Sequence, residues 1–216
     1  MAMVQGTASA EERAAKIKLL LFDVDGVLTD GTIWLFPSPA RSERTMNSQT
    51  GELADSGGYA IHSQSMMEAK GFNAHDGTAI SLARLGGIQT GLITKRISET
   101  VALRARDLRV DHVHQGISDK LAAFEQILRK EKLQADQAAY VGDDIIDLPV
   151  MRRCGLAIAV PNARKEVLDC AHYVTPHGGG QGAARDAVEF ILSAQGRLEE
   201  VIREYLEDRI PAKPHP

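Results

Sequence analysis

The chain has 216 residues, of which 44% are hydrophobic and 5% aromatic, and its formal net charge is −4. The hydrophobic share is large enough for a substantial core, and the negative charge argues against a general nucleic-acid binder, which is normally basic. Cys154 and Cys170 have neither CxxC spacing nor a nearby histidine cluster, so we expect two small, buried or half-buried thiols in a cytoplasmic protein.

Residues 1–16 are small, polar and charged, which predicts a loose N-terminal arm or a short helix. The apolar run that follows, IKLLLF at 17–22, has the length of a strand covered on both faces. It is too short to span a membrane and lacks the pattern of a signal peptide. Residues 32–71 are irregular and rich in Gly, Pro, Ser and Thr, and we expect a hairpin built from TIWLF and GGYAIHSQSMM.

From residue 78 onward, helix and strand patterns alternate. Helices are predicted at 78–86, 98–108, 118–133, 145–154, 163–170 and 182–196, and strands at 88–94, 111–116, 138–142, 155–160 and 171–175. Ser98 is a candidate helix cap. Alternation at this spacing predicts an α/β fold, a doubly wound, Rossmann-like parallel sheet with helices on both faces. We expect the sheet domain at 17–196, with the hairpin insert at 32–71, and a C-terminal helix and tail at 197–216.

Ionisable or hydroxyl side chains stand where several of these strands end. Asp23 and Asp25 follow the first strand, Thr94 ends the next one in the alternating region, Lys120 begins a later helix, and Asp143 follows the strand after that. The carboxyl ends of parallel strands meet at one edge of the sheet, so we expect these side chains around a single crevice. Converging carboxylates repel one another unless a cation lies between them, and an all-oxygen set of ligands suits Mg²⁺.

Such a site favours phosphoryl transfer. A metal neutralises charge on the transferred group, Lys120 adds a second positive charge, and a carboxylate can attack phosphorus to give an acyl phosphate. A second carboxylate can act as an acid toward the leaving oxygen and as a base toward water. The residues therefore indicate a Mg²⁺-dependent phosphoryl-transfer enzyme.

Four motifs, DVDGVLTDG, Thr94, Lys120 and GDDIID, resemble those of haloacid dehalogenase-like phosphatases in order and spacing. The resemblance implies that Asp23 is the nucleophile and a metal ligand. It implies that Asp25 is the acid/base and binds the metal through its backbone carbonyl. It also implies that Thr94 hydrogen-bonds the phosphoryl group, that Lys120 holds the nucleophile and the phosphate, and that Asp143 completes the metal site.

Longer segments, among them FNAHDG, TKRISETVALR and YVGDDIIDLPVM, are similar to the 3-deoxy-D-manno-octulosonate 8-phosphate phosphatase family. That likeness implies a haloacid dehalogenase type of fold with a β-hairpin flap and no large cap domain. It implies a Mg²⁺-dependent homotetramer of lipopolysaccharide biosynthesis that uses a phospho-aspartyl intermediate. Its partner would be a small-molecule sugar phosphate, while the net charge and the short apolar run predict no nucleic-acid and no membrane partner. The family positions imply substrate contacts by Asp25, Asn73, Ala74, His75, Asp76, Gly77, Arg96, Arg104 and Lys120.

Three residues differ from the family pattern. Lys95 replaces the glycine of TGR, His75 replaces the arginine of FNxRDG, and Ser81 stands at a position that is often cationic. These differences leave a nonulosonate 9-phosphate or another sugar phosphate open as the substrate. A non-catalytic tetrameric scaffold is a further alternative, which the complete set of motif residues disfavours.

Other polar features have more than one interpretation. Asp144 is a candidate for the outer shell of the metal. For Asp147, a structural role that caps or charges the start of a helix is favoured slightly over a functional one. Arg104 lies in an arginine-rich helix, where ion pairs with neighbours are an alternative to substrate binding. The GGGQG turn at 178–182 is explained by tight packing as well as by phosphate binding.

Overall fold

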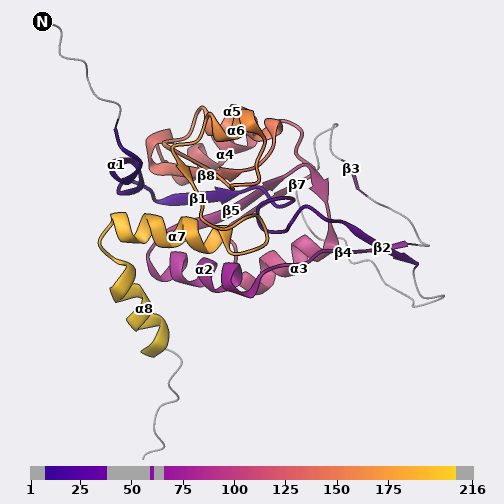
Figure 1. The fold of residues 1–216 in the computed structure, drawn as a ribbon, viewed down its shortest axis with the longest axis horizontal. Helices are drawn as coiled ribbons and strands as arrows, with labels where there is room; N and C mark the ends of the chain where they lie inside the picture. The colour runs from indigo at the N-terminus through magenta and orange to yellow at the C-terminus, as the bar shows by residue number, and fades with distance from the viewer. Residues whose placement is uncertain (1–7, 38–58, 61–65, 208–216) are drawn as a thin grey trace, which may run out of the picture.

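The computed structural model describes residues 8–37, 59–60 and 66–207 (Figure 1). Its main sheet is parallel throughout, as the alternating sequence pattern predicted. In spatial order the strands are β10 (Tyr173–Val174), β9 (Leu156–Ala159), β8 (Ala138–Gly142), β1 (Leu19–Phe22), β5 (Gln89–Thr94) and β7 (His112–Gln115).

Helices cover both faces of this sheet (Figure 1). One face carries α2 (Ala74–Leu85), α3 (Glu99–Leu108) and α7 (Ala183–Ala194), with α1 (Ala10–Ala14) and α8 (Leu198–Glu207) packed against α7. The other face carries α4 (Lys120–Glu131), α5 (Leu148–Met151) and α6 (Lys165–Leu168). Strand β1 serves both cores, because Leu20 and Phe22 pack into one and Leu19 and Leu21 into the other. This two-sided burial explains its unbroken apolar sequence.

The position of β1 decides where a site can form. The strand order runs outward from β1 in two directions, with β5 and β7 on one side and β8, β9 and β10 on the other. The carboxyl end of β1 is therefore flanked by those of β5 and β8. In open parallel sheets, ligands bind at such a reversal of strand order. Asp23, Thr94 and Asp143, which end or follow these strands, consequently come to the same edge.

The predicted hairpin is present at its base. Strand β2 (Trp34–Pro37) pairs antiparallel with β4 (Met66–Ala69). The expected second strand over 57–67 differs, because β3 (Tyr59–Ala60) pairs instead with β6 (Arg96–Ile97) in a separate two-stranded sheet. The remaining expectations for this insert fall on 38–58 and 61–65, outside the described residues, as do those for 1–7 and 208–216.

Several predicted boundaries shift for identifiable reasons. Helix α2 begins at Ala74 rather than Thr78, because the side chain of Asn73 accepts a hydrogen bond from the amide of His75 and caps the helix. The segment 145–154 forms a short 3-10 turn followed by α5, where one helix was expected. Ser98 precedes α3, but its hydroxyl donates to Glu68 and makes no cap.

Cys154 and Cys170 are free thiols, buried and half-buried respectively, as the sequence predicted. Within the described part of the chain, no helix has the length and apolar character required to cross a membrane.

Candidate active site

Asp23 lies at the point where β1 turns into its loop and is only 4% exposed. Its amide donates to the carbonyl of Val141 on the neighbouring strand at 3.0 Å, which fixes its backbone. The loop that follows contains Gly26 at φ +96°, a conformation that favours glycine. A Cβ at Gly26 would stand 2.1 Å from Oδ2 of Asp143, so glycine also permits the close approach of the loop to that carboxylate.

Lys120 is the first residue of α4 and is 2% exposed. Asp119 caps this helix by accepting a hydrogen bond from the amide of Ala122 at 2.9 Å, which defines where α4 begins. The Lys120 ammonium lies 2.9 Å from Oδ2 of Asp23 and 2.7 Å from Oδ1 of Asp147. Burial alone would lower the pKa of Lys120, but the two carboxylates outweigh it and raise that pKa. The site therefore contains a charged ammonium held between two carboxylates.

Asp147 is completely buried, and both of its oxygens are used. Oδ1 accepts from Lys120 and from the hydroxyl of Tyr140 at 2.8 Å, while Oδ2 accepts from the amides of Asp143 and Asp144 at 3.1 and 3.2 Å. The expected capping role is thus present, but the sequence interpretation missed the contact with Lys120. The sequence signal for Asp147 was its spacing from Asp143, because a helical turn brings a residue four positions later back beside the first. That spacing places Asp147 at the site where Lys120 was expected.

Burial and repulsion act on the acidic cluster. Carboxylate oxygens of Asp23, Asp143 and Asp147 lie within 4.8 Å of one another. Burial, followed by repulsion from the other two, raises the pKa of Asp143 to about 8. Burial raises the pKa of Asp23 to about 7, although Lys120 opposes this rise. Crowded carboxylates with raised pKa values indicate that additional positive charge, such as a metal ion, would stabilise the site.

The donor set fits a hard divalent cation. Oδ1 of Asp143 is buried and has no hydrogen-bond partner among the described residues. Because the oxygens of Asp147 are already bonded, Asp23 and Asp143 are the side chains best placed to hold a metal. Oxygen ligands of this kind suit Mg²⁺.

Asp25 lies at the base of the hairpin, where Lys70 meets it. The Lys70 ammonium, with a side chain that is 0% exposed, forms an ion pair with Oδ1 of Asp25, and Nε of Arg96 lies 3.6 Å from Oδ2. Thr94, two residues before Arg96, is the last residue of β5 and is buried. Sequence reasoning missed Lys70 and its neighbour Glu68 because both fall in the irregular 32–71 region. The available signal was two opposite charges two residues apart, which a strand places on one face.

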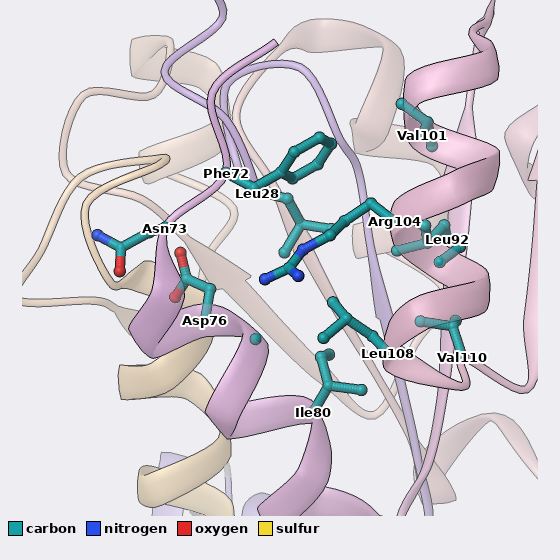
Figure 2. A pocket seen from close by; sticks show the side chains of 12 residues that line it. Leu28, Phe72, Asn73, Asp76, Ile80, Leu92, Val101, Arg104, Leu108 and Val110 are labelled. Atoms are coloured by element: carbon teal, nitrogen blue, oxygen red, sulfur yellow. The ribbon is translucent and has the colours of Figure 1, made fainter.

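Part of the segment 73–77 comes together with Arg104 in a second place, where Figure 2 labels Asn73, Asp76 and Arg104. A pocket of about 20 Å³ is lined by Asn73, Asp76, Gly77 and Arg104 among mainly apolar residues, and neither Asp23 nor Lys120 lines it. That volume has room for about one water molecule, not a sugar phosphate. NH1 of Arg104 also pairs with Asp107 at 2.8 Å, which fits the ion-pair interpretation.

Two members of this segment also have structural contacts. Oδ1 of Asp76 accepts a hydrogen bond from the amide of Arg185 at 2.9 Å, at the start of α7. The amide side chain of Asn73 donates to the carbonyl of Gly180 at 3.4 Å. Ala74 and His75 are exposed at the start of α2. The substrate segment expected from the sequence is thus tied to the beginning of α7.

The glycine-rich turn at 178–182 packs against the loop after β1. The amide of Gly180 donates to the carbonyl of Val27 at 2.9 Å, and a Cβ at Gly179 would lie 1.8 Å from the carbonyl oxygen of Gly26. Tight packing therefore accounts for these glycines, as one of the two sequence interpretations held. The turn supports the same loop that carries Asp25.

Comparisons with known proteins agree with this geometry. A family model described as haloacid dehalogenase-like hydrolase matches residues 93–185. The 3-deoxy-D-manno-octulosonate 8-phosphate phosphatase of Yersinia pestis is 39% identical over 188 residues, which cover 87% of this chain and 86% of that protein. The enzyme of the same name from Escherichia coli strain K12 is 37% identical over 93% of both chains.

A solved structure gives a similar result. The 3-deoxy-D-manno-octulosonate 8-phosphate phosphatase from Moraxella catarrhalis, in complex with a magnesium ion, a phosphate ion and a KDO molecule, superposes with a TM-score of 0.75 at 32% identity. The match covers 91% of this chain and 97% of that one.

The raised pKa values of Asp23 and Asp143 predict a stability that depends on both pH and metal. Each carboxyl binds its proton more tightly in the folded than in the unfolded protein. Its stabilising contribution is therefore complete below the unfolded pKa of about 4 and is lost as the pH rises through the folded values. A divalent cation replaces the lost proton, so Mg²⁺ should stabilise the protein more at higher pH.

We expect Mg²⁺ to raise the Tm of chelator-treated protein by roughly 4–8 °C at about pH 8, as an effect of about 2 kcal/mol, and by much less at about pH 5.5. Thermal unfolding at both pH values measures this. The Asp143→Asn variant serves as the control and should lose most of the shift. Equal Mg²⁺ shifts at the two pH values would contradict the assignment of the metal to these carboxylates.

Proposed function

This chain belongs to the 3-deoxy-D-manno-octulosonate 8-phosphate phosphatase family of haloacid dehalogenase-like hydrolases, and we propose that it hydrolyses that sugar phosphate to the sugar acid and inorganic phosphate. It is a phosphatase with Mg²⁺ as its cofactor. The observation that carries the proposal is the buried cluster in which Lys120 contacts Asp23 while Asp143 stands beside it.

In the first half-reaction, a carboxylate oxygen of Asp23 attacks phosphorus. A bond forms between that oxygen and phosphorus, while the bond between phosphorus and the sugar oxygen breaks. Asp25 donates a proton to the leaving sugar oxygen, which departs as an alcohol. Lys120 supports this step because its ammonium, 2.9 Å from Oδ2 of Asp23, holds the nucleophile and can offset charge on the entering phosphate.

In the second half-reaction, water attacks the phosphorus of the phospho-aspartyl group. Asp25 takes a proton from that water, the bond between phosphorus and Asp23 breaks, and inorganic phosphate leaves. The proton that Asp25 gave up is thereby restored. One carboxylate thus serves as the acid in the first half and as the base in the second.

Asp23 and Asp143 would hold Mg²⁺ together with the backbone carbonyl of Asp25, in keeping with the all-oxygen donor set. When bound, the ion supplies neutralisation of the charge on the phosphoryl group. Thr94, at the end of β5, is proposed to hydrogen-bond the phosphoryl oxygens. These roles rest on family position together with the convergence of the strand ends.

The substrate shell is proposed to include Arg96, which already lies beside Asp25, together with Arg104 and the segment 73–77. A substrate that carries both a carboxylate and a phosphate requires cations of this kind. The pocket around Arg104 is too small for the substrate, so binding requires that this side chain move outward or that the substrate reach its exposed face.

We also propose that the protein is a cytoplasmic homotetramer that acts in lipopolysaccharide biosynthesis. Every residue of β2 is exposed, including Trp34, Leu35 and Phe36, and Figure 1 shows this hairpin reaching beyond the edge of the sheet. Contiguous exposed apolar side chains of this kind favour packing against another protein surface. Contacts between hairpins of several copies would also help to close a site that has no large cap domain.

Phosphate release from a panel of sugar phosphates tests the reaction and its substrate. With Mg²⁺, we expect strong preference for 3-deoxy-D-manno-octulosonate 8-phosphate over a nonulosonate 9-phosphate and hexose phosphates. Removal of Mg²⁺ and the Asp23→Asn substitution should each reduce the rate by at least about 1000-fold, because both the nucleophile and its charge balance are required. The Asp136→Asn variant is the matched control and should keep its activity, because Asp136 lies in the turn before the amino end of β8, at the opposite end of that strand from Asp143.

A preference for the nonulosonate would change the assigned substrate but leave the mechanism as proposed. The changed specificity would then be assigned to the differences at Lys95 and His75. An Asp23→Asn variant as active as the original protein would contradict the proposed mechanism.

The molar mass in solution tests the assembly. Light scattering during size exclusion should give four chains for the original protein, and Trp34→Glu should shift the population to smaller species. Leu206→Glu provides a matched control, because Leu206 on α8 is as exposed as Trp34, at 58%. If Trp34→Glu leaves the mass unchanged, the hairpin does not form the proposed contact.

A further inference from the structure

The hairpin return strand brings two charged residues next to the proposed acid/base. Glu68 lies on β4 and Lys70 follows that strand, while Arg96 comes from β6 and Asp25 from the loop after β1. Lys70 pairs with Asp25 and lies 3.8 Å from Oε1 of Glu68. Arg96 lies 3.6 Å from Asp25 through Nε and 3.6 Å from Oε2 of Glu68 through NH2. These four residues form a closed charge ring in which each carboxylate contacts both cations.

Glu68 occupies a fixed place in this charge ring. Its Oε1 accepts a hydrogen bond from the hydroxyl of Ser98 at 2.7 Å, and its side chain is only 13% exposed. Lys70 and Arg96 are long side chains with many rotamers, and side chains of this kind lose freedom only when several partners hold them. A carboxylate that contacts both cations can hold them in place at once.

We propose that Glu68 is a positioning residue for the phosphatase reaction, and that it orients the carboxylate of Asp25 through Lys70 and Arg96. Glu68 acts at one remove, because the cations lie between it and Asp25. The proposal rests on the proposed function, in which Asp25 gives a proton to the leaving oxygen and then takes one from water. Displacement of a catalytic group by about 1 Å can cost roughly 100-fold in rate.

The charge ring also has a simpler interpretation, in which it only fastens the hairpin to the sheet domain. The two interpretations differ in what they predict for the leaving group. A sugar alkoxide needs a proton in order to leave, whereas p-nitrophenolate leaves without one. Misplacement of Asp25 should therefore slow the cleavage of a sugar phosphate much more than the first-turnover cleavage of p-nitrophenyl phosphate. Loss of fastening would slow both reactions alike.

The test compares Glu68→Gln and Lys70→Met with the original protein in the presence of Mg²⁺. On 3-deoxy-D-manno-octulosonate 8-phosphate, we expect kcat to fall by about 10- to 100-fold in both variants. With p-nitrophenyl phosphate in stopped flow, the first-turnover burst should stay within about 3-fold of the original rate, while the later steady state slows because water attack also needs Asp25.

Glu99→Gln is the matched control. It makes the same chemical change at an exposed residue in the first turn of α3, outside the charge ring, and should leave both rates unchanged. Thermal unfolding of each variant shows that the comparison uses folded protein. Glutamine keeps the size of Glu68 and an acceptor for Ser98, so we expect this variant to fold.

Two outcomes would overturn the inference. One is a Glu68→Gln variant that matches Glu99→Gln on the sugar phosphate. Another is an equal slowing of the burst and of sugar phosphate cleavage, which would leave the ring with a fastening role alone. A failure of the proposed function itself looks different, because the original protein would then release no phosphate with Mg²⁺ from either compound.

Discussion

The contact of Lys120 with Asp23 and Asp147 is the interaction on which the rest of the site depends. Several carboxylates are gathered in a buried crevice, and an unpaired buried charge costs roughly several kcal/mol. One buried ammonium offsets part of that cost and holds the proposed nucleophile in one place. The surrounding structure serves this contact: β1 delivers Asp23 from the centre of the sheet, and the cap by Asp119 starts α4 where Lys120 can reach inward. The charge that Lys120 leaves unbalanced, evident in the raised pKa of Asp143, is the opening for a metal.

The two carboxylates with proposed catalytic roles, Asp23 and Asp25, are held in place by different parts of the structure. Asp23 is held from the interior of the sheet, by Lys120 and through it by Asp147 and Tyr140. Asp25 is held instead by Lys70 from the hairpin and by Arg96 from β6. A nucleophile must keep one position, whereas an acid/base must reach first a sugar oxygen and then a water. Support of Asp25 by an added hairpin means that the position of the hairpin and the second chemical role are physically linked.

Much of the fold could be predicted from local patterns. The run at 17–22 reads as a doubly covered strand because every side chain meets a core, and the alternation after residue 78 gave the parallel sheet. Polar residues at the strand ends could be brought together because parallel strands share one edge. The pattern gave no role for Tyr140, and for Glu68 and Lys70 it offered only two opposite charges two residues apart. The roles of all three arise from contacts between segments that the periodicity does not relate. The short distance between Asp76 and α7 is of the same kind, because a helix cap supplied from another helix leaves no local signal.

The most direct test of the account is to find where the phosphoryl group is bound during turnover. The protein is mixed with substrate and Mg²⁺, quenched in acid after a few milliseconds and digested, and the peptides are weighed by mass spectrometry. We predict a phosphoryl mass on the peptide that contains Asp23, removed by hydroxylamine and absent from Asp23→Asn. In Asp25→Asn, which lacks the base for water attack, this adduct should accumulate with an activated aryl phosphate. Full turnover with no adduct on that peptide at any quench time, in either protein, would contradict the assignment of Asp23 as the nucleophile.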